Sequence, residues 1–415
     1  MLPKPFLTAA TLVLLVPLTG QSGDTPQPFS GLGLCNGQTS AATSLILADG
    51  LDSAIKVPAD VPTIQAAIDQ SQSGQVVLVA PGTYQENLNL AGKSVQLVSE
   101  YVLTGDVTKI GTTIIDGGGR RAVIRIPREA KPGTRIVGLT IRNGSDGIAP
   151  YVPFDLLHCH VTGCGDGIDY EGGGGLIRGC KFWANRDDAI DLDGSTAATI
   201  ESCQLIDNGD DGIEIRLHRH TWPRLNIVIR NNAILRNGED GIQLIGYEQK
   251  TARRIRIERN FICNNRMAGI GLMDGADTRE DLVGAGLPEL LLILHNTFVG
   301  NDCHITGGAN VLCANNIFAS AKTVALRNMR PTSLVVNNLV WNNATDTEQT
   351  QAEDSLSVDP RLNDQFQPAV DSPAVNKAIR TAVLNQAAYG LQPAGRIPDA
   401  KPDLGAYEVP ERPAE

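Results

Sequence analysis

Three features are scarce in this sequence: aromatic side chains, long apolar runs and positive charge. Aromatic residues make up 4% of the 415 residues, whereas there are 43 glycines. Few aromatics with many glycines indicate short strands joined by many turns. Lysine and arginine number 35 against 46 aspartates and glutamates, a formal net charge of −11. This acid excess argues against nucleic acid as the main partner, and the 42% of hydrophobic residues excludes a disordered chain.

The apolar run near the N-terminus, from Phe6 to Leu18, is too short to span a bilayer. It follows Lys4, and no later stretch of 18 apolar residues exists. We therefore predict no membrane span, a signal peptide over residues 1–22 and a leader or linker over residues 23–56. An uncleaved, disordered start is the alternative. The protein is expected to be secreted or periplasmic, and a monomer.

The sequence also lacks the usual cysteine and histidine motifs. No His/Cys spacing matches a zinc site, and no Ser-His-Asp set is visible. Cys159, Cys180 and Cys203 recur at one position of a repeat, where stacked Cβ vectors would point the same way. We therefore expect free thiols there, although neighbouring members could approach disulfide distance.

That repeat is the main feature the sequence does contain. Eight copies can be anchored on Cys159, Cys180, Cys203, Asn232, Asn260, Asn296, Asn316 and Asn338. The residues three before and two after the anchor are apolar in every copy, and the residue five after is Asn in six of them. Each copy continues into another short strand that opens with a motif such as Asp-Gly-Ile. Coils of roughly 22 residues made of short strands and turns predict an all-β parallel β-helix over residues 57–345, with the Asn column as a hydrogen-bonded ladder.

A solenoid needs capped ends, because open strand edges aggregate. Residues 60–68 look like an N-capped amphipathic helix that could close the first coil. Residues 346–415 are expected to form a C-terminal cap and tail. His295 precedes the Asn ladder, and we expect its side chain to be exposed.

Acidic side chains gather in the second short strand of several copies. The third residue after the motif aspartate should point away from the core, which places Asp169, Asp191 and Glu214 in one outer column. Stacked like charges repel unless a cation neutralises them. Ca²⁺, which takes roughly six to eight oxygen ligands, suits such a column. Alternatively, each motif aspartate caps its own turn.

Three consecutive coils are lengthened after this strand, at 216–224, 245–254 and 274–289. Loops lengthened on one face of a solenoid usually build its binding face. Two of these loops are rich in arginine, histidine and lysine, which favours an acidic polysaccharide as the partner. The predicted substrate-binding residues are His218, Arg219, His220 and Arg253. Alternatively, these side chains simply pair with nearby acids on the surface.

Residues 57–345 resemble the right-handed parallel β-helix superfamily that includes pectate lyases, polygalacturonases, pectin methylesterases and alginate epimerases. Within this region, Cys180–Leu192 resembles the calcium-binding coil of polysaccharide lyase family nine, with its C-x-x-W-x-N-x-D-D-G-x-D-L pattern. The resemblance implies a single-stranded, right-handed solenoid that binds Ca²⁺. The implied metal ligands are Asp166, Asp187, Asp188 and Asp191. Ala189 stands where the family has glycine.

The family uses a lysine base on a later coil, for which the candidates here are Arg216 and Lys250. No G-H-G, D-P-H-D or methylesterase motif is present. The sequence thus predicts an exported, calcium-dependent polysaccharide lyase that cleaves a uronate-containing glycan by β-elimination. The alternative is a non-catalytic carbohydrate-binding or structural β-helix of the periplasm or cell surface. A hydrolase, with two carboxyl groups about 5–9.5 Å apart, ranks third.

Overall fold

The computed structural model describes residues 50–409, except 91, 248–250, 276–280 and 393–400. The predicted signal peptide, most of the predicted linker and the candidate base Lys250 lie outside the described residues. Among the described helices, none has the length and apolar character needed to cross a membrane.

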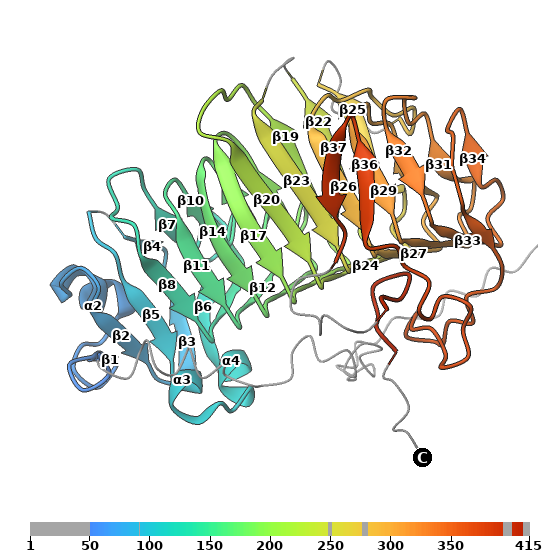
Figure 1. Ribbon diagram of the computed structural model, residues 1–415. Helices are drawn as coiled ribbons and strands as arrows, with labels where there is room; N and C mark the ends of the chain where they lie inside the picture. Colours follow the sequence, from blue (N-terminus) through green and yellow to red (C-terminus); the bar gives the residue numbers. More distant parts are fainter. Residues whose placement is uncertain (1–49, 91, 248–250, 276–280, 393–400, 410–415) are drawn as a thin grey trace, which may run out of the picture.

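The described chain winds into a long parallel β-helix with three sheets, and a typical coil contributes one strand to each sheet (Figure 1). Sheet A contains β1 (Ile55–Val57), β2 (Val76–Val79), β5 (Gln96–Ser99), β8 (Thr134–Val137), β11 (Phe154–Leu157), β14 (Gly173–Arg178), β17 (Thr196–Glu201), β20 (Leu225–Arg230), β23 (Arg253–Glu258), β26 (Leu290–Leu294), β29 (Val311–Ala314) and β32 (Leu334–Val336).

Sheet B contains β3 (Gly82–Gln85), β6 (Thr113–Asp116), β9 (Thr140–Arg142), β12 (His160–Thr162), β15 (Lys181–Trp183), β18 (Gln204–Ile206), β21 (Ala233–Leu235), β24 (Phe261–Cys263), β27 (Thr297–Val299), β30 (Ile317–Ala319), β33 (Leu339–Trp341) and β35 (Leu356–Ser357). Sheet C contains β4 (Leu88–Asn89), β7 (Ile124–Ile126), β10 (Ile148–Pro150), β13 (Ile168–Tyr170), β16 (Ile190–Leu192), β19 (Ile213–Leu217), β22 (Ile242–Gly246), β25 (Ala268–Asp274), β28 (Cys303–Thr306), β31 (Val324–Arg327) and β34 (Thr347–Glu348).

The two predicted apolar columns are confirmed by the strand register. In sheet A the paired residues are Leu156, Ile177, Ile200, Ile229, Ile257, Ile293, Cys313 and Val335. In sheet B they are Val161, Phe182, Leu205, Ile234, Ile262, Phe298, Phe318 and Val340. Both columns are buried in one continuous core. The few aromatics take part in this stacking, since the rings of Phe298 and Phe318 lie 4.9 Å apart.

The predicted Asn ladder is present between sheets B and C. Each side-chain amide donates to the amide oxygen of the next coil, at 2.9–3.1 Å, along Asn185, Asn208, Asn237, Asn265 and Asn301. A second ladder, not predicted, joins the anchor asparagines between sheets A and B: Asn232, Asn260, Asn296, Asn316 and Asn338. These amides are buried, so the ladders satisfy groups that water cannot reach.

The stacked cysteines Cys159, Cys180 and Cys203 are buried free thiols, as expected. Their sulfurs contact backbone carbonyl groups, and the side chains of Cys180 and Cys203 also interact with each other. The Sγ atom of Cys180, for example, lies 3.4 Å from the carbonyl oxygen of Leu156 in the preceding coil.

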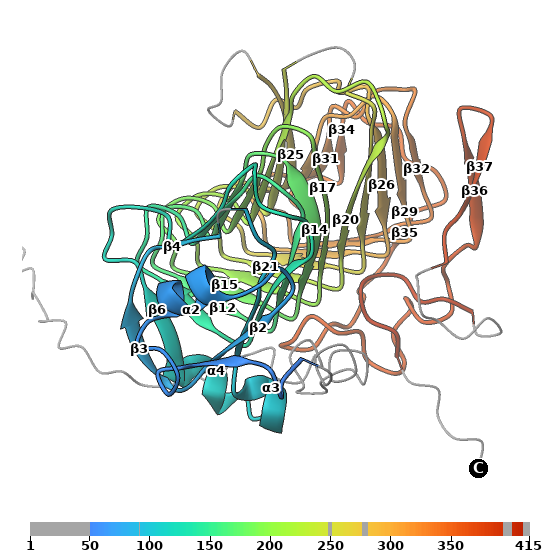
Figure 2. The same cartoon turned by 90° about the vertical axis from the view of Figure 1, so that its left-hand side faces the viewer.

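Short helices cover the N-terminal end of the solenoid (Figure 2). Helix α2 (Ile64–Gln70) inserts Ile64, Ala67 and Ile68 into the core. The two oxygens of Glu86 accept the first free backbone N–H groups of this helix, at 2.9 Å each. Helices α3 (Tyr101–Thr104) and α4 (Thr108–Thr112) pack on the outer face of sheet A. Apolar edges of the first coils are thereby covered.

The C-terminal segment folds back along the later coils. The antiparallel hairpin of β36 (Thr381–Leu384) and β37 (Ala387–Gly390) stands beside sheet A (Figures 1 and 2). Leu384 and Leu391 pack there on leucines of β26 and β29. This segment also overturns our expectation for His295, whose ring is fully buried. Its nitrogens lie 3.1 Å from the carbonyl oxygen of Asp403 and 2.8 Å from that of Leu391.

Replacing one ladder amide should destabilise the coil stack. In Asn237→Ala, the amide of Asn208 loses its acceptor and the oxygen of Asn265 loses a donor. We expect the free energy of unfolding, measured by denaturant titration, to fall by about 3 kcal/mol. The matched control is Asn226→Ala, at an exposed position of β20, with a change within about 0.5 kcal/mol. Equal losses of unfolding free energy in the two variants would show that the ladder makes no specific contribution to stability.

Candidate functional site

The predicted outer column of acids is present on sheet C. Asp169 pairs with Asp191, Asp191 with Glu214, and Glu214 with Gln243 in consecutive strands. We call Asp169, Asp191 and Glu214 the acidic column. The side chains lie outside the apolar core, yet Asp191 and Glu214 are only 5% and 6% exposed. The column is therefore more deeply covered than an outward direction alone implies.

A second set of acids, the aspartate ladder, occupies the turns that lead into sheet C. It consists of the motif aspartates Asp166, Asp188, Asp211 and Asp240. In each case Oδ1 accepts the backbone N–H that opens the same turn one coil later, at 2.5–3.0 Å. These aspartates therefore do cap turns, as the alternative held. Each one caps the equivalent turn of the following coil and not its own turn. Their carboxylates join consecutive coils.

The two sets meet in three groups of acids whose ligand atoms lie within 4.8 Å of one another. One group is Asp187, Asp188 and Asp210, and another is Asp188, Asp191 and Glu214. Asp188 belongs to both, so three of the four predicted metal ligands fall in two adjoining groups, with Asp187 in one and Asp191 in the other.

The fourth predicted ligand, Asp166, falls in a separate group with Asp146 and Asp169. The sequence analysis omitted Asp146, although it opens an Asp-Gly-Ile motif one coil before Asp166. Asp210 and Glu214 were recognised as acids but not as metal ligands.

The group around Asp191 suits a divalent cation. Its atom Oδ1 is buried without a hydrogen-bond partner, and Oδ1 of Asp193 is in the same state. Asp188 uses Oδ1 for the ladder, which leaves its other oxygen for a ligand. Buried carboxylate oxygens without donors are costly unless a cation or proton neutralises them. Carboxylate oxygens are also the ligands that Ca²⁺ prefers.

The acids without a bound cation should hold protons near neutral pH. Burial, with added repulsion from Glu214 and Asp193, raises the pKa of Asp191 to about 9. Burial also raises the pKa of Asp166 to about 7 and that of Asp210 to about 7. For Asp188, burial and neighbouring acids raise the pKa well above its ordinary value.

One basic side chain lies over the acidic column. Nε of Arg216 is 2.5 Å from Oε1 of Glu214, and Nη1 is 3.7 Å from Oδ2 of both Asp191 and Asp193. Burial disfavours the guanidinium charge, but these three carboxylates outweigh it and raise the pKa of Arg216. A charged guanidinium is therefore the resting state. The predicted role of Arg216 as a base stays a prediction.

An aromatic residue that the sequence analysis missed completes this surface. Tyr247 follows β22 at the start of a lengthened loop, and its ring stacks on that of His218 at 4.9 Å between centroids. Burial and the column acids raise the pKa of Tyr247, although Arg216 opposes them. Nδ1 of His218 lies 3.7 Å from Oδ1 of Asp193. The described parts of two of the three lengthened loops therefore border the acids.

The other predicted substrate-binding residues are placed differently. Arg219 is exposed beside His218. Arg253 is 5% exposed, and its guanidinium donates to the carbonyl groups of Gly194, His218 and Thr251. This arginine joins three coils and has little reach for a ligand. His220 lines a cavity at the start of sheet A strands, to which none of the column acids contributes.

Comparisons with known proteins agree on the architecture. The family model described as "Right handed beta helix region" matches residues 129–222. The crystal structure of pectate lyase Pel9A is similar over 83% of this chain and 90% of its own, at 14% identity and a TM-score of 0.53. No match was found among curated proteins.

Two further solved structures are similar at a TM-score of 0.49. One is the mannuronan C-5 epimerase AlgE4 A-module of Azotobacter vinelandii, 17% identical over 71% of this chain and 90% of its own. The other is the catalytic unit of a GH87 α-1,3-glucanase from Streptomyces thermodiastaticus, 14% identical over 70% of this chain and 61% of its own. With the family model and the likeness to Pel9A, the predicted right-handed parallel β-helix fold is confirmed.

The raised carboxyl pKa values predict how stability depends on pH in a chelator. The folded chain keeps protons that the unfolded chain releases above about pH 4. Stability should therefore fall as pH rises from about 4 through the folded values of about 7 and about 9. Between about pH 5 and 8 we expect a loss of at least about 1.4 kcal/mol, the equivalent of one pKa unit. Denaturant titrations in EDTA measure this.

Calcium should reverse the loss, and more at pH 8 than at pH 5, because only ionised carboxylates bind the cation. Asp191→Asn should flatten the pH slope. The control Asp207→Asn removes an acid from an exposed ion pair with Arg236 on another face, and it should leave the slope in place. A stability that rises with pH in EDTA would contradict the assignment.

Proposed function

We propose that this protein is an exported, calcium-dependent polysaccharide lyase that cleaves a uronate-containing glycan by β-elimination. The observation that carries the proposal is the group of Asp188, Asp191 and Glu214, which has an unpartnered buried oxygen and lies against a single arginine. A cation-binding group beside a basic side chain is the combination that this reaction needs. The fold shared with pectate lyase Pel9A is compatible with it but does not establish it.

The residues that would hold Ca²⁺ are Asp188, Asp191 and Glu214, with Asp187 and Asp210 on the other side of Asp188. When bound, the ion would neutralise a sugar carboxylate and acidify the adjacent C–H bond. The stacked rings of His218 and Tyr247, with centroids 4.9 Å apart, lie at the edge of this surface. A sugar chain could pack against them there. Asp191 and Glu214 are buried, which would keep their carboxylates out of bulk water. Charge interactions are weaker in bulk water than in such a site.

Arg216 can accept a proton only after losing its own. Asp191, Glu214 and Asp193 oppose that loss, because their negative charges hold the proton on the guanidinium. A cation that neutralised Asp191 and Glu214 would weaken their hold on the proton of Arg216 and lower the pKa of its guanidinium. Arg216 is therefore the candidate base of the occupied site. The other candidate, Lys250, lies outside the described residues.

A non-catalytic carbohydrate-binding protein is the second candidate. The observation in its favour is the same ion-paired state of Arg216, since a guanidinium that stays charged can bind a uronate but cannot remove a proton. The two functions predict the same ligand and differ in whether a product forms.

Substitutions in the column should abolish activity selectively. We expect wild-type protein with Ca²⁺ to release unsaturated uronides, detected by ultraviolet absorbance, from pectate, alginate or a glycosaminoglycan. Asp188→Asn and Asp191→Asn should lower kcat/KM by at least about a hundredfold, or about 2.7 kcal/mol. Both should also weaken Ca²⁺ binding in calorimetric titrations at least about tenfold.

Asp207→Asn is the control for loss of one carboxylate and should retain full activity. Arg216→Gln should lose activity without loss of Ca²⁺ affinity, whereas Arg216→Lys should keep part of it because a proton-accepting amine remains. Binding of the glycan without any unsaturated product would refute the lyase and support the binding protein.

A further inference from the structure

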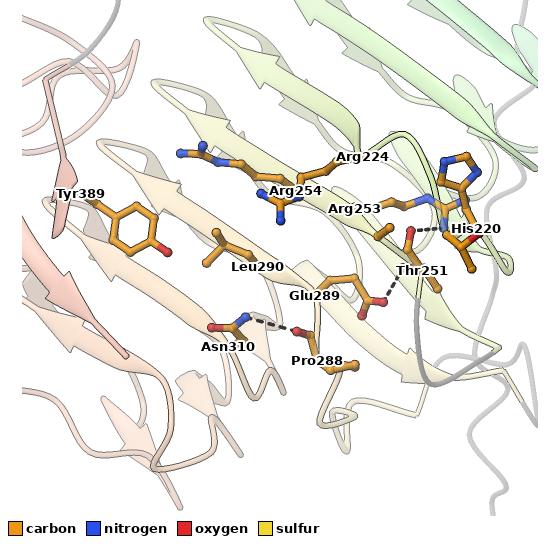
Figure 3. Close-up of a pocket in the computed structure, with 12 residues that line it drawn as sticks. His220, Arg224, Thr251, Arg253, Arg254, Pro288, Glu289, Leu290, Asn310 and Tyr389 are labelled. Atoms are coloured by element: carbon orange, nitrogen blue, oxygen red, sulfur yellow. Dashed lines mark hydrogen bonds between the residues drawn. The ribbon is translucent and has the colours of Figure 1, made fainter. Parts of the chain in front are cut away.

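A cavity of about 630 Å³ opens on the side of sheet A, away from the acidic column (Figure 3). Its walls are the starts of β23 and β26, the loop before β20 and the hairpin residue Tyr389. None of the acids of the column or of the aspartate ladder lines it. The volume lies in the range of about 300–1,000 Å³ in which small ligands are usually bound.

Three arginines line this cavity and give it a local positive charge. The guanidinium of Arg253 is bonded to backbone carbonyl groups. Arg224 and Arg254 lie in the cavity between Tyr389 at one end and His220 at the other (Figure 3). Within the described part of the chain, neither guanidinium has an ion-pair partner, in contrast to Arg216. The guanidinium carbon of Arg254 lies 6.0 Å from the centre of the Tyr389 ring, a contact that positions it. Unpaired cations are notable in a chain of net charge −11.

One oxygen of a buried carboxylate in the same cavity lacks a hydrogen-bond partner. Glu289 is 6% exposed, and its Oε1 accepts a hydrogen bond from Thr251. Its other oxygen, Oε2, is buried and has no hydrogen-bond partner. An ionised carboxylate oxygen can only accept hydrogen bonds. A ligand that bonds to this oxygen therefore needs a donor, such as a hydroxyl group. A buried polar atom without a partner is the kind of exception that a bound molecule explains.

We propose that this cavity is a second binding site for an acidic glycan and holds one carboxylated sugar residue at a distance from the reaction site. The sugar carboxylate meets Arg224 and Arg254, and a ring hydroxyl donates to Oε2 of Glu289. Leu290 and Pro288 supply apolar surface for the sugar ring. The inference rests on the proposed function for the class of sugar, but it requires neither metal nor catalysis.

The arrangement discriminates among ligands by charge and by hydrogen-bond donors. A neutral sugar leaves the two guanidinium groups without an anion. A simple anion such as acetate offers no donor to Glu289 and is repelled by its charge. A sugar acid satisfies both requirements at once. A chain held here and at the acidic column would be bound at two points, which raises its effective concentration at the column.

Calorimetric titration of oligogalacturonate and oligoalginate in EDTA tests the site without any contribution from a metal. We expect wild type and Asp188→Asn to bind an acidic oligosaccharide equally well. Arg224→Gln, Arg254→Gln and Glu289→Gln should each weaken the affinity at least about tenfold, the usual effect of losing a charge-assisted hydrogen bond. Arg254→Lys should retain part of the affinity, because it keeps the charge.

The matched control is Arg236→Gln, which removes one arginine from an exposed ion pair on another face and should change the affinity less than about twofold. Denaturant midpoints confirm that each variant is folded. The proposal is overturned if wild type binds no acidic oligosaccharide in EDTA, or if it binds a neutral maltooligosaccharide as tightly. It is also overturned if Arg236→Gln loses as much affinity as Arg254→Gln. Binding in EDTA without lyase activity would refute the proposed function alone.

Discussion

The structure depends on the stacking of equivalent side chains at the strand spacing of about 4.8 Å. Most coils repeat the register of the last, so equivalent positions lie over one another and often carry the same residue type. Isoleucine over isoleucine builds the core, as in Ile200 and Ile229. Asparagine over asparagine satisfies both donor and acceptor in each amide. The repeat therefore selects side chains that attract their own copies.

Stacked aspartates differ from the other columns because their like charges repel one another. The candidate site lies where most of these stacked acids are found. In the aspartate ladder one oxygen of each carboxylate is occupied by a backbone N–H, as between Asp188 and Asp211. Burial and mutual repulsion disfavour negative charge on the remaining oxygens and on the acidic column, which raises the pKa values of Asp188 and Asp191. Protons, Arg216 or a cation can balance these charges. The stacking that creates the repulsion also brings carboxylates close enough to one another to suit a divalent ion.

Much of the fold could be predicted because its signals are local and repeated. The apolar columns, the Asn ladder between Asn185 and Asn301, and the vertical alignment of Asp169, Asp191 and Glu214 all follow from counting along the chain. The second Asn ladder was missed because its residues served only as anchors. Asp146 was missed because its motif precedes the first anchored copy.

Contacts between distant segments could not be predicted in this way. His295 is covered by Asp403, more than a hundred residues later, and Arg253 reaches a carbonyl group 59 residues earlier. Their partners are backbone atoms, which leave no trace in side-chain patterns. The cavity at Arg254 is likewise bordered by Tyr389 from the hairpin, and only the folded chain brings the two together.

The return of the C-terminal segment onto the middle coils has a consequence for biosynthesis. Leu292 and Leu312 are sealed by Leu384 and Leu391, and His295 by Asp403. These coils are translated long before the residues that cover them. During synthesis the growing solenoid therefore presents an unfinished apolar flank, and only the final stretch of polypeptide closes it. A ribosome that stops early would release a chain whose coils are wound but whose side is open to aggregation.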